Sequence, residues 1–171
     1  VSLADNEWKI NHSSTTQVDR FKITIDEVIL ANEQTQNFSY IEFRDGVCVL
    51  AITNDNKVVM LKQYRHPLQS TELEFPAGMI EEDEEPLYAA QRELLEETGY
   101  QAEDWQSLDY FYPSPGSTTE KIHLYLATKA TKVDDQFLDE LENIEVEIVN
   151  MKDFCKLVEQ GIFRHGAGLA C

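Results

Sequence analysis

Basic residues are scarce in this chain. It carries 14 lysines and arginines against 32 aspartates and glutamates among 171 residues, so its formal net charge is −18. A surface of that sign repels nucleic acid and anionic membranes, and neither is expected as a partner. The same surface repels an anionic small molecule, unless bound cations and a few local arginines reverse the field.

Cysteines and long apolar runs are also few. Cys48, Cys155 and Cys171 are scattered and odd in number, and their spacing fits neither a zinc site nor a disulfide framework. No apolar stretch approaches the roughly 18 residues of a membrane-spanning helix. The first residues lack the basic and then apolar segments of a signal peptide. We therefore expect a reduced, cytoplasmic protein without a membrane segment.

The hydrophobic pattern predicts strands before, between and after two helices. The length favours one domain with a sizeable core. Strands are expected over 20–30, 36–44, 47–53, 58–64, 73–75, 105–112, 122–128 and 144–149, with 46–64 forming a hairpin. Helices are expected over 86–98 and 151–160, and another should start within 161–171, whereas polar residues 1–19 should be partly disordered. This order of elements predicts α/β packing in layers.

Residues 78–100 read GMIEEDEEPLYAAQRELLEETGY and predict a tight turn, an acidic loop and an amphipathic helix. Pro86 suits the first helical position, because its missing N–H has no intrahelical partner to lose there. Gly99 suits the left-handed position just past the helix end. The helix is therefore expected to begin at Pro86 and to stop just before Gly99.

This helix should have two different faces. At 3.6 residues per turn, Glu93, Glu96 and Glu97 fall on one face. Four apolar residues fall roughly opposite: Leu87, Tyr88, Leu94 and Leu95. We expect the apolar side to be buried and the other side to present the three carboxylates.

Three carboxylates so close together need a counter-charge. Like charges at i, i+4 repel by roughly 0.2–0.5 kcal/mol per pair. Arg92 can offset part of this through Glu96, and a divalent cation would offset more. Clustered oxygen ligands suit Mg²⁺ or Mn²⁺ rather than Zn²⁺, which prefers His and Cys. The alternative is a solvated acidic face, which is the usual fate of a charge run.

The spacing within this stretch resembles the Nudix box, Gly-x5-Glu-x7-Arg-Glu-U-x-Glu-Glu-x-Gly-U, where U is a bulky apolar residue. The matching positions are Gly78, Glu84, Arg92, Glu93, Leu94, Glu96, Glu97 and Gly99. Tyr100 stands where an aliphatic residue is usual. The match implies pyrophosphate chemistry on a nucleoside diphosphate linked to another group.

Outside the box, about residues 20–165 resemble the ADP-ribose pyrophosphatase branch of this family. The matching elements are Gln63-Tyr64-Arg65, the run 74–79, Ser114-Pro115-Gly116 and the segment 140–146. Pro115 lies fifteen residues beyond Tyr100, about where this branch carries its distinguishing proline. Each element also has an ordinary alternative: a turn for 114–116, surface charges for the arginines, and solvated acids for Glu140 and Glu142.

The resemblance implies the Nudix fold, an α/β architecture with a mixed β-sheet sandwiched between α-helices. It also implies an N-terminal antiparallel β extension over 1–45 that exchanges within a homodimer, followed by a Nudix domain over 46–171. The implied reaction is Mg²⁺-dependent cleavage of ADP-ribose to AMP and ribose 5-phosphate.

Residue roles are carried over from the same resemblance. The implied metal ligands are the Ala77 carbonyl and the carboxylates of Glu93, Glu96, Glu97 and Glu142. Glu140 is the expected general base, with Glu120 and Glu96 as alternatives, while Glu84 and Arg92 orient the helix carboxylates. The implied substrate-binding residues are Arg44, Arg65, Met79, Ser114, Pro115, Gly116 and Glu120.

Other substrates and one other class of protein stay open. A nucleotide sugar such as GDP-mannose, or a broad range of ADP-sugars, is the nearest alternative. NADH is less favoured because its usual Ser-Gln-Pro-Trp-Pro-Phe motif is absent, and Pro115 disfavours dinucleoside polyphosphates. A non-catalytic ADP-ribose sensor is disfavoured because every carboxylate of the box is present and no basic helix accompanies it.

Overall fold

The computed structural model describes residues 8–139 and 141–171, and the chain divides into two compact units. The N-terminal unit contains the described residues up to 44 together with 114–120. The core unit contains 45–113 and the described residues from 121 onward.

The N-terminal unit is an antiparallel sheet of three strands in the order β1-β2-β3. Its strands are β1 (Lys9–Val18), β2 (Phe21–Ile29) and β3 (Thr35–Glu42). Segment 114–120 belongs here because it bonds to the end of β3: the Ile41 N–H donates to the Ser117 carbonyl at 2.9 Å, and the Thr119 N–H donates to the Ile41 carbonyl at 3.1 Å.

Strand β1 corrects the prediction of partial disorder over residues 1–19. It pairs with β2 from Lys9↔Ile29 to Val18↔Phe21, and every one of its residues is exposed. An exposed edge strand needs no alternating apolar residues, because its hydrogen bonds and polar cross-strand pairs, such as the Thr15 and Thr24 hydroxyls at 2.9 Å, define its register. The remainder of that prediction, residues 1–7, lies outside the described residues.

The core unit is built on a mixed sheet with the order β11-β5-β4-β10-β8, to which β6, β7 and β9 add on β5, β4 and β10. The strands are β4 (Gly46–Thr53), β5 (Lys57–Arg65), β6 (Ser70–Glu74), β7 (Ala77–Met79), β8 (Tyr100–Gln101), β9 (Asp104–Phe111), β10 (Ile122–Lys132) and β11 (Ile144–Asn150). Strands β4 and β10 run parallel, and the other pairs are antiparallel. The predicted β4–β5 hairpin is confirmed.

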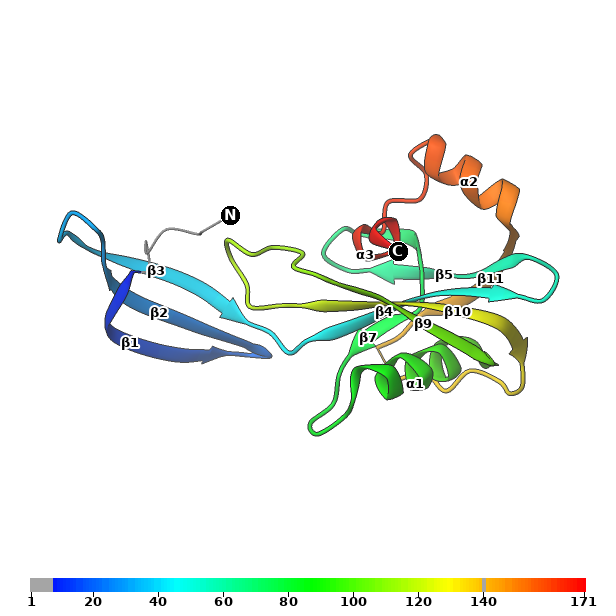
Figure 1. Cartoon of the computed structure of the whole chain (residues 1–171), viewed down its shortest axis with the longest axis horizontal. Helices are drawn as coiled ribbons and strands as arrows, with labels where there is room; N and C mark the ends of the chain where they lie inside the picture. Colours follow the sequence, from blue (N-terminus) through cyan, green and yellow to red (C-terminus); the bar gives the residue numbers. More distant parts are fainter. Residues whose placement is uncertain (1–7, 140) are drawn as a thin grey trace. The chain divides into compact units, whose positions relative to one another are not determined.

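Helices cover both faces of this sheet (Figure 1). On one face lies α1 (Pro86–Thr98), whose Ala90 and Leu94 pack against apolar residues of β4, β5 and β10. On the other face lie α2 (Met151–Glu159) and α3 (Gly166–Ala170), which join a second cluster around Phe75 and Phe163. The predicted Nudix-type layering, a mixed sheet between helices, is confirmed.

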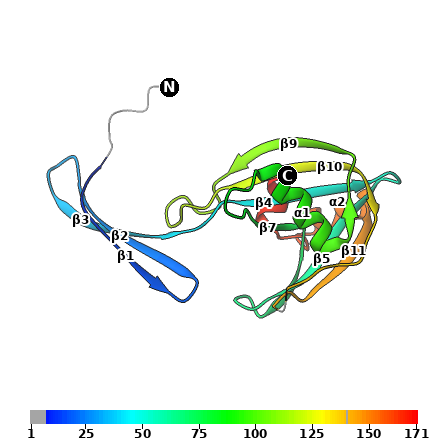
Figure 2. The same cartoon turned by 90° about the horizontal axis from the view of Figure 1, so that it is seen from below.

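Helix α1 has the predicted ends but only part of the predicted faces, since Leu94 is buried as expected. Pro86 opens it, and Gly99 closes it at φ +73° with its N–H bonded to the Leu95 carbonyl at 2.7 Å. Glu93 and Glu97, however, are buried, whereas Tyr88 is 64% exposed. The two glutamates share the helical face of the small residues Ala89 and Ala90, which is buried. Figure 2 shows α1 lying along the sheet, and its contacts are mainly with β4 and β7.

Three smaller differences concern strands. The short strands β7 and β8 were not predicted, and Gly78 lies inside β7 rather than in a tight turn. Strand β10 runs to Lys132, beyond its predicted end at 128.

Within the described part of the chain, no helix is both long and apolar enough to cross a bilayer.

Substitutions at two glycines with positive φ allow the cost of backbone strain to be measured separately from the cost of steric overlap. At Gly99, an added Cβ would lie 2.0 Å from the Asp134 carbonyl oxygen, whereas at Gly161, at φ +65°, it would meet nothing within 4 Å. We expect Gly161→Ala to lower the free energy of unfolding by about 1–2 kcal/mol through φ alone. Gly99→Ala should lose about 1–3 kcal/mol more through overpacking. Equal losses in urea unfolding would contradict the packing of α1 against this loop.

Candidate active site

The site centres on two carboxylates that α1 buries against β7. Glu97 is 3% exposed, and its Oε2 accepts the Ala77 N–H at 2.9 Å. The Glu93 carboxylate lies directly against Gly78, where an added Cβ would be 2.1 Å from Oε1. Gly78 is therefore required for contact between strand and helix, which is a different reason from the turn that the sequence predicted.

Arg92 connects the acidic loop to the exposed edge of this helix. Its Nε and Nη2 each donate to the Glu84 carboxylate at 2.9 Å, and Nη2 also donates to the Met79 carbonyl at 3.0 Å. Its Nη1 donates to Glu93 Oε1 at 2.8 Å and to Glu96 Oε2 at 3.1 Å. The orienting role of Glu84 and Arg92 stays a prediction, and these are the contacts that such a role requires.

Burial controls the ionisation of the two inner carboxyls. It raises the pKa of Glu97 well above its usual range, against the opposing hydrogen bond from the Ala77 N–H. Burial also raises the pKa of Glu93, and the Arg92 guanidinium opposes this effect. Smaller like-charge contributions from Glu142 raise the pKa of both groups. Two buried carboxyls thus lack sufficient positive charge nearby.

This donor set fits a hard divalent cation. Among the described residues, no three His, Cys, Asp or Glu side chains are already arranged around a common metal position. Glu93 and Glu97 nonetheless offer buried oxygen donors one helical turn apart, and a cation would relieve the unfavourable burial that raises their pKa values. Oxygen donors without His or Cys suit Mg²⁺ or Mn²⁺ rather than Zn²⁺.

The other predicted metal ligands differ in their surroundings. Glu96 is partly exposed and bonds only to Arg92 among the described side chains. Glu142 lies outside the helix, and its Oε2 accepts the Asp139 N–H at 2.9 Å. Glu140, the expected base, lies outside the described residues.

The predicted substrate-binding residues fall in both units. In the core unit, Arg65 is paired with Glu74 and Met79 is 59% exposed. Those in the N-terminal unit are Arg44, Ser114, Pro115, Gly116 and Glu120. The Ser114 carbonyl accepts the N–H groups of Ser117 and Thr118 at 3.0 Å, so this segment forms the turn that its composition predicts, whatever its role. Burial raises the pKa of Glu120.

Sequence reasoning missed two residues beside this site, Glu74 and His165. The buried Glu74 carboxylate accepts hydrogen bonds from Arg65 Nε at 2.8 Å and Nη2 at 2.6 Å. His165 Nδ1 accepts the Phe75 N–H at 3.1 Å, across 90 positions of sequence. Glu74 was visible only as part of a motif, and no local signal connects His165 to that motif.

Because burial raises the pKa of Glu97, replacing this residue with glutamine should stabilise the folded protein at high pH. A carboxyl whose folded pKa is raised stabilises the fold below its unfolded pKa, and this contribution is lost as pH rises through the folded pKa. Glu97→Gln keeps an acceptor for the Ala77 N–H but removes the buried charge. In chelator, we expect the variant to melt above the wild type at pH 8, by roughly 2–4 °C for each kcal/mol gained, with the gain shrinking toward pH 4.5.

Glu96→Gln is the matched control for this experiment. Glu96 is a partly exposed partner of Arg92, so its replacement should change the free energy of unfolding by less than about 1 kcal/mol. A Glu97→Gln variant that is no more stable than the wild type at pH 8 would contradict the burial penalty.

Comparison with known proteins agrees with this geometry. The NUDIX domain family model matches residues 42–166. A solved structure, "Crystal structure of ADP compounds hydrolase", superposes with a TM-score of 0.85 at 22% identity, covering 96% of this chain and 89% of the other, and supports the fold.

Three named relatives are similar in sequence. An ADP-ribose pyrophosphatase of Bacillus subtilis is 41% identical over 136 residues, 79% of this chain and 74% of the relative. A methanol dehydrogenase activator of Bacillus methanolicus is 43% identical over 128 residues, 71% of this chain and 69% of the relative. A GDP-mannose pyrophosphatase of Cronobacter sakazakii is 32% identical over 130 residues, covering 70% and 67%. With Glu93 and Glu97 of its box buried on one helix against β7, the chain belongs to the Nudix hydrolase family.

Proposed function

We propose that this Nudix hydrolase cleaves ADP-ribose to AMP and ribose 5-phosphate with the help of Mg²⁺. The observation that carries the proposal is the buried pair Glu93 and Glu97, held against Ala77 and Gly78. The choice of ADP-ribose is supported by the Bacillus subtilis relative, which is named an ADP-ribose pyrophosphatase.

The proposed metal ligands come from β7, from α1 and from the loop before β11. They are the Ala77 carbonyl and the carboxylates of Glu93, Glu96, Glu97 and Glu142. When bound, Mg²⁺ supplies charge neutralisation at the diphosphate and makes a water molecule more acidic. Mn²⁺ is the alternative cation, because it accepts the same oxygen ligands.

The chain itself then has to move a proton and hold the substrate. Glu140 is the proposed general base that takes the proton of the attacking water, with Glu120 and Glu96 as the alternatives. Arg65 is proposed to bind phosphate oxygens with the guanidinium edge that Glu74 does not occupy.

The proposed contacts to the rest of the substrate come from the family resemblance. Arg44 is assigned to phosphate or ribose oxygens, and Glu120 to ribose hydroxyls. Met79 and the turn Ser114-Pro115-Gly116 are assigned to the ribose. A homodimer formed through the N-terminal strands belongs to the same proposal.

GDP-mannose is the second candidate substrate. The Cronobacter sakazakii relative is named a GDP-mannose pyrophosphatase and is 32% identical to this chain. Both candidate substrates contain a diphosphate, which the carboxylates are proposed to contact through Mg²⁺ and the arginines directly. They differ in the base and the sugar, so only a direct comparison separates them.

The first test is a substrate panel. The purified protein is incubated with ADP-ribose, GDP-mannose, NADH and diadenosine polyphosphates, with and without Mg²⁺, and the products are resolved. We expect AMP and ribose 5-phosphate from ADP-ribose, with the highest kcat/KM of the panel and no turnover in chelator. Glu97→Gln should lose this turnover. A higher kcat/KM for GDP-mannose would overturn the substrate, and binding of ADP-ribose without any turnover would indicate a sensor.

A second experiment identifies the base. We expect Glu140→Gln to lower kcat by about 10²–10⁴-fold, because a general base contributes that much to proton transfer. KM and the Mg²⁺ concentration for half-maximal activity should change little. Glu120→Gln is the matched comparison, and this pattern in Glu120→Gln instead would reassign the base.

A further inference from the structure

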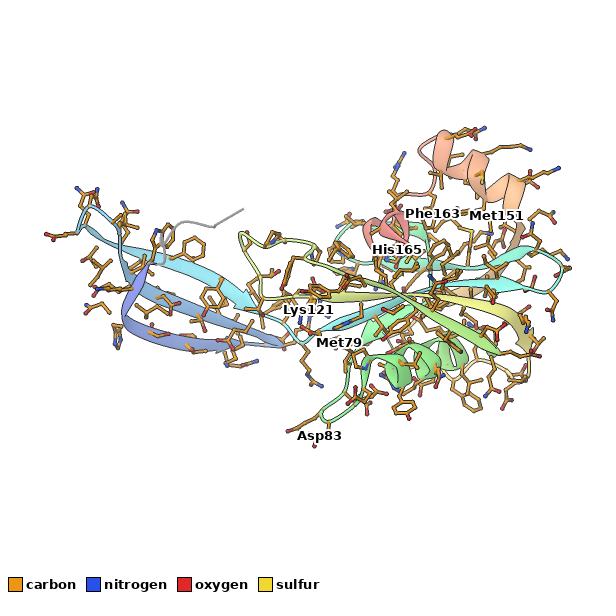
Figure 3. All side chains as sticks on the ribbon, in the orientation of Figure 1. Met79, Asp83, Lys121, Met151, Phe163 and His165 are labelled. Atoms are coloured by element: carbon orange, nitrogen blue, oxygen red, sulfur yellow. The ribbon has the colours of Figure 1, made fainter. Side chains whose placement is uncertain are left out.

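We propose that His165 is a positioning residue that acts through Glu74 to orient the substrate-binding Arg65, an inference that rests on the proposed function. His165 lies at the start of α3, and Figure 3 shows it beside Phe163. No side chain of α3 belongs to the box or to its flanking motifs, so this role is additional to the site described above.

The contacts of His165 define one tautomer. Its Nδ1 accepts the Phe75 N–H at 3.1 Å, so the proton of the neutral ring is on Nε2. That Nε2 lies 3.9 Å from Glu74 Oε2. Burial lowers the pKa of His165, and Glu74 opposes this effect only in part. The lowered pKa favours the neutral form that the Phe75 contact requires, and the Nε2–H of that form lies near the Glu74 carboxylate but beyond hydrogen-bond distance.

Glu74 passes this constraint to Arg65. The Glu74 side chain is 7% exposed and receives two hydrogen bonds from one edge of the guanidinium, Nε and Nη2. A two-point contact of this kind restricts both the position and the plane of the arginine. The Arg65 side chain is 41% exposed, and within the described residues Nη1 has no hydrogen-bond partner. Arg65 is thus oriented on one edge while the other edge can meet a phosphate.

The packing around His165 keeps its ring in place. The Phe163 ring lies 4.9 Å from the Phe75 ring, between centroids. A Cβ at Gly168 would be 2.5 Å from the Phe163 ring and 3.1 Å from His165 Nδ1, so α3 approaches closely because position 168 has no side chain. The segment Glu74–Ala77 is consequently held from both sides of the sheet, by His165 and Phe163 on one side and by Glu97, through the Ala77 N–H, on the other.

Two substitutions at position 165 separate this role from simple packing. In His165→Asn, the amide oxygen replaces Nδ1 as acceptor for the Phe75 N–H, so KM for ADP-ribose should stay within about twofold of the wild type. In His165→Leu, the acceptor for the Phe75 N–H is lost, and KM should rise about tenfold with a smaller change in kcat, since one buried polar contact is worth roughly that factor. Val58→Ala is the control for stability loss, because Val58 is fully buried in the same apolar cluster but about 23 Å along β5 from Arg65.

A double-mutant cycle with Arg65→Gln tests the route. Arg65→Gln alone should raise KM, and adding His165→Leu to it should change KM by less than about twofold, because coupled residues are not additive. A full tenfold effect of His165→Leu in the Arg65→Gln background would overturn the proposal, as would equal KM changes in Val58→Ala and His165→Leu. A normal KM in His165→Leu would overturn it too, while leaving the proposed function intact. A normal KM in Arg65→Gln would overturn it together with the phosphate-binding role of Arg65, but not the proposed reaction.

The orientation itself can be measured without a substrate. In ¹⁵N NMR spectra, the Arg65 Nε–H signal, assigned by its loss in Arg65→Lys, should be protected from exchange in the wild type and in His165→Asn but not in His165→Leu. An Arg65 signal that is equally protected in His165→Leu would refute the positioning role. This holds even if the wild type hydrolyses no member of the substrate panel, the result that would defeat the proposed function.

Discussion

The burial of two carboxylates between α1 and β7 is the constraint on which the rest of this site depends. Glu93 and Glu97 lie among the alanines that bring the helix onto the sheet, so the core and the reactive groups share one helical face. Water is largely excluded from both carboxyls, and each is held by a single kind of donor: Arg92 for Glu93 and the Ala77 N–H for Glu97. Burial of these carboxylates costs electrostatic free energy, and the same packing holds their oxygen atoms in fixed positions.

The short segment from Glu74 to Ala77 joins this constraint to the other face of the sheet. Its last residue bonds to α1 through Glu97, and its first two residues meet His165 at the start of α3. The two apolar clusters are therefore not independent supports. Each packs one side of the strand segment that presents both a candidate metal ligand and the partner of Arg65.

Local chemistry allowed much of this arrangement to be predicted. Proline and glycine define the ends of α1 through backbone geometry, and alternation located most strands of the sheet, so these elements needed no knowledge of distant contacts. Spacing also located the carboxylates. It did not show that their face is buried, because large apolar side chains such as Tyr88 outweighed the small alanines that let the helix approach the sheet.

Features that depend on distant contacts could not be predicted in this way. Strand β1 is polar throughout, and only its pairing with β2 makes it a strand. The contact of His165 with Phe75 joins residues 90 positions apart in the sequence, and neither residue type predicts it. The orientation of Arg65 by Glu74 depends on how β5 and β6 pair.

The close fit of Gly78 against Glu93 also limits how this protein can change by mutation. Any side chain at position 78 would occupy the space of the Glu93 carboxylate. Shortening residue 93 to aspartate would make room, but it would withdraw the carboxylate by about 1.5 Å, the length of one carbon–carbon bond. A side chain at position 78 therefore fits only after residue 93 has been shortened, and a variant that changes the glycine first must displace the carboxylate. The pair forms a mutational barrier at the centre of the site.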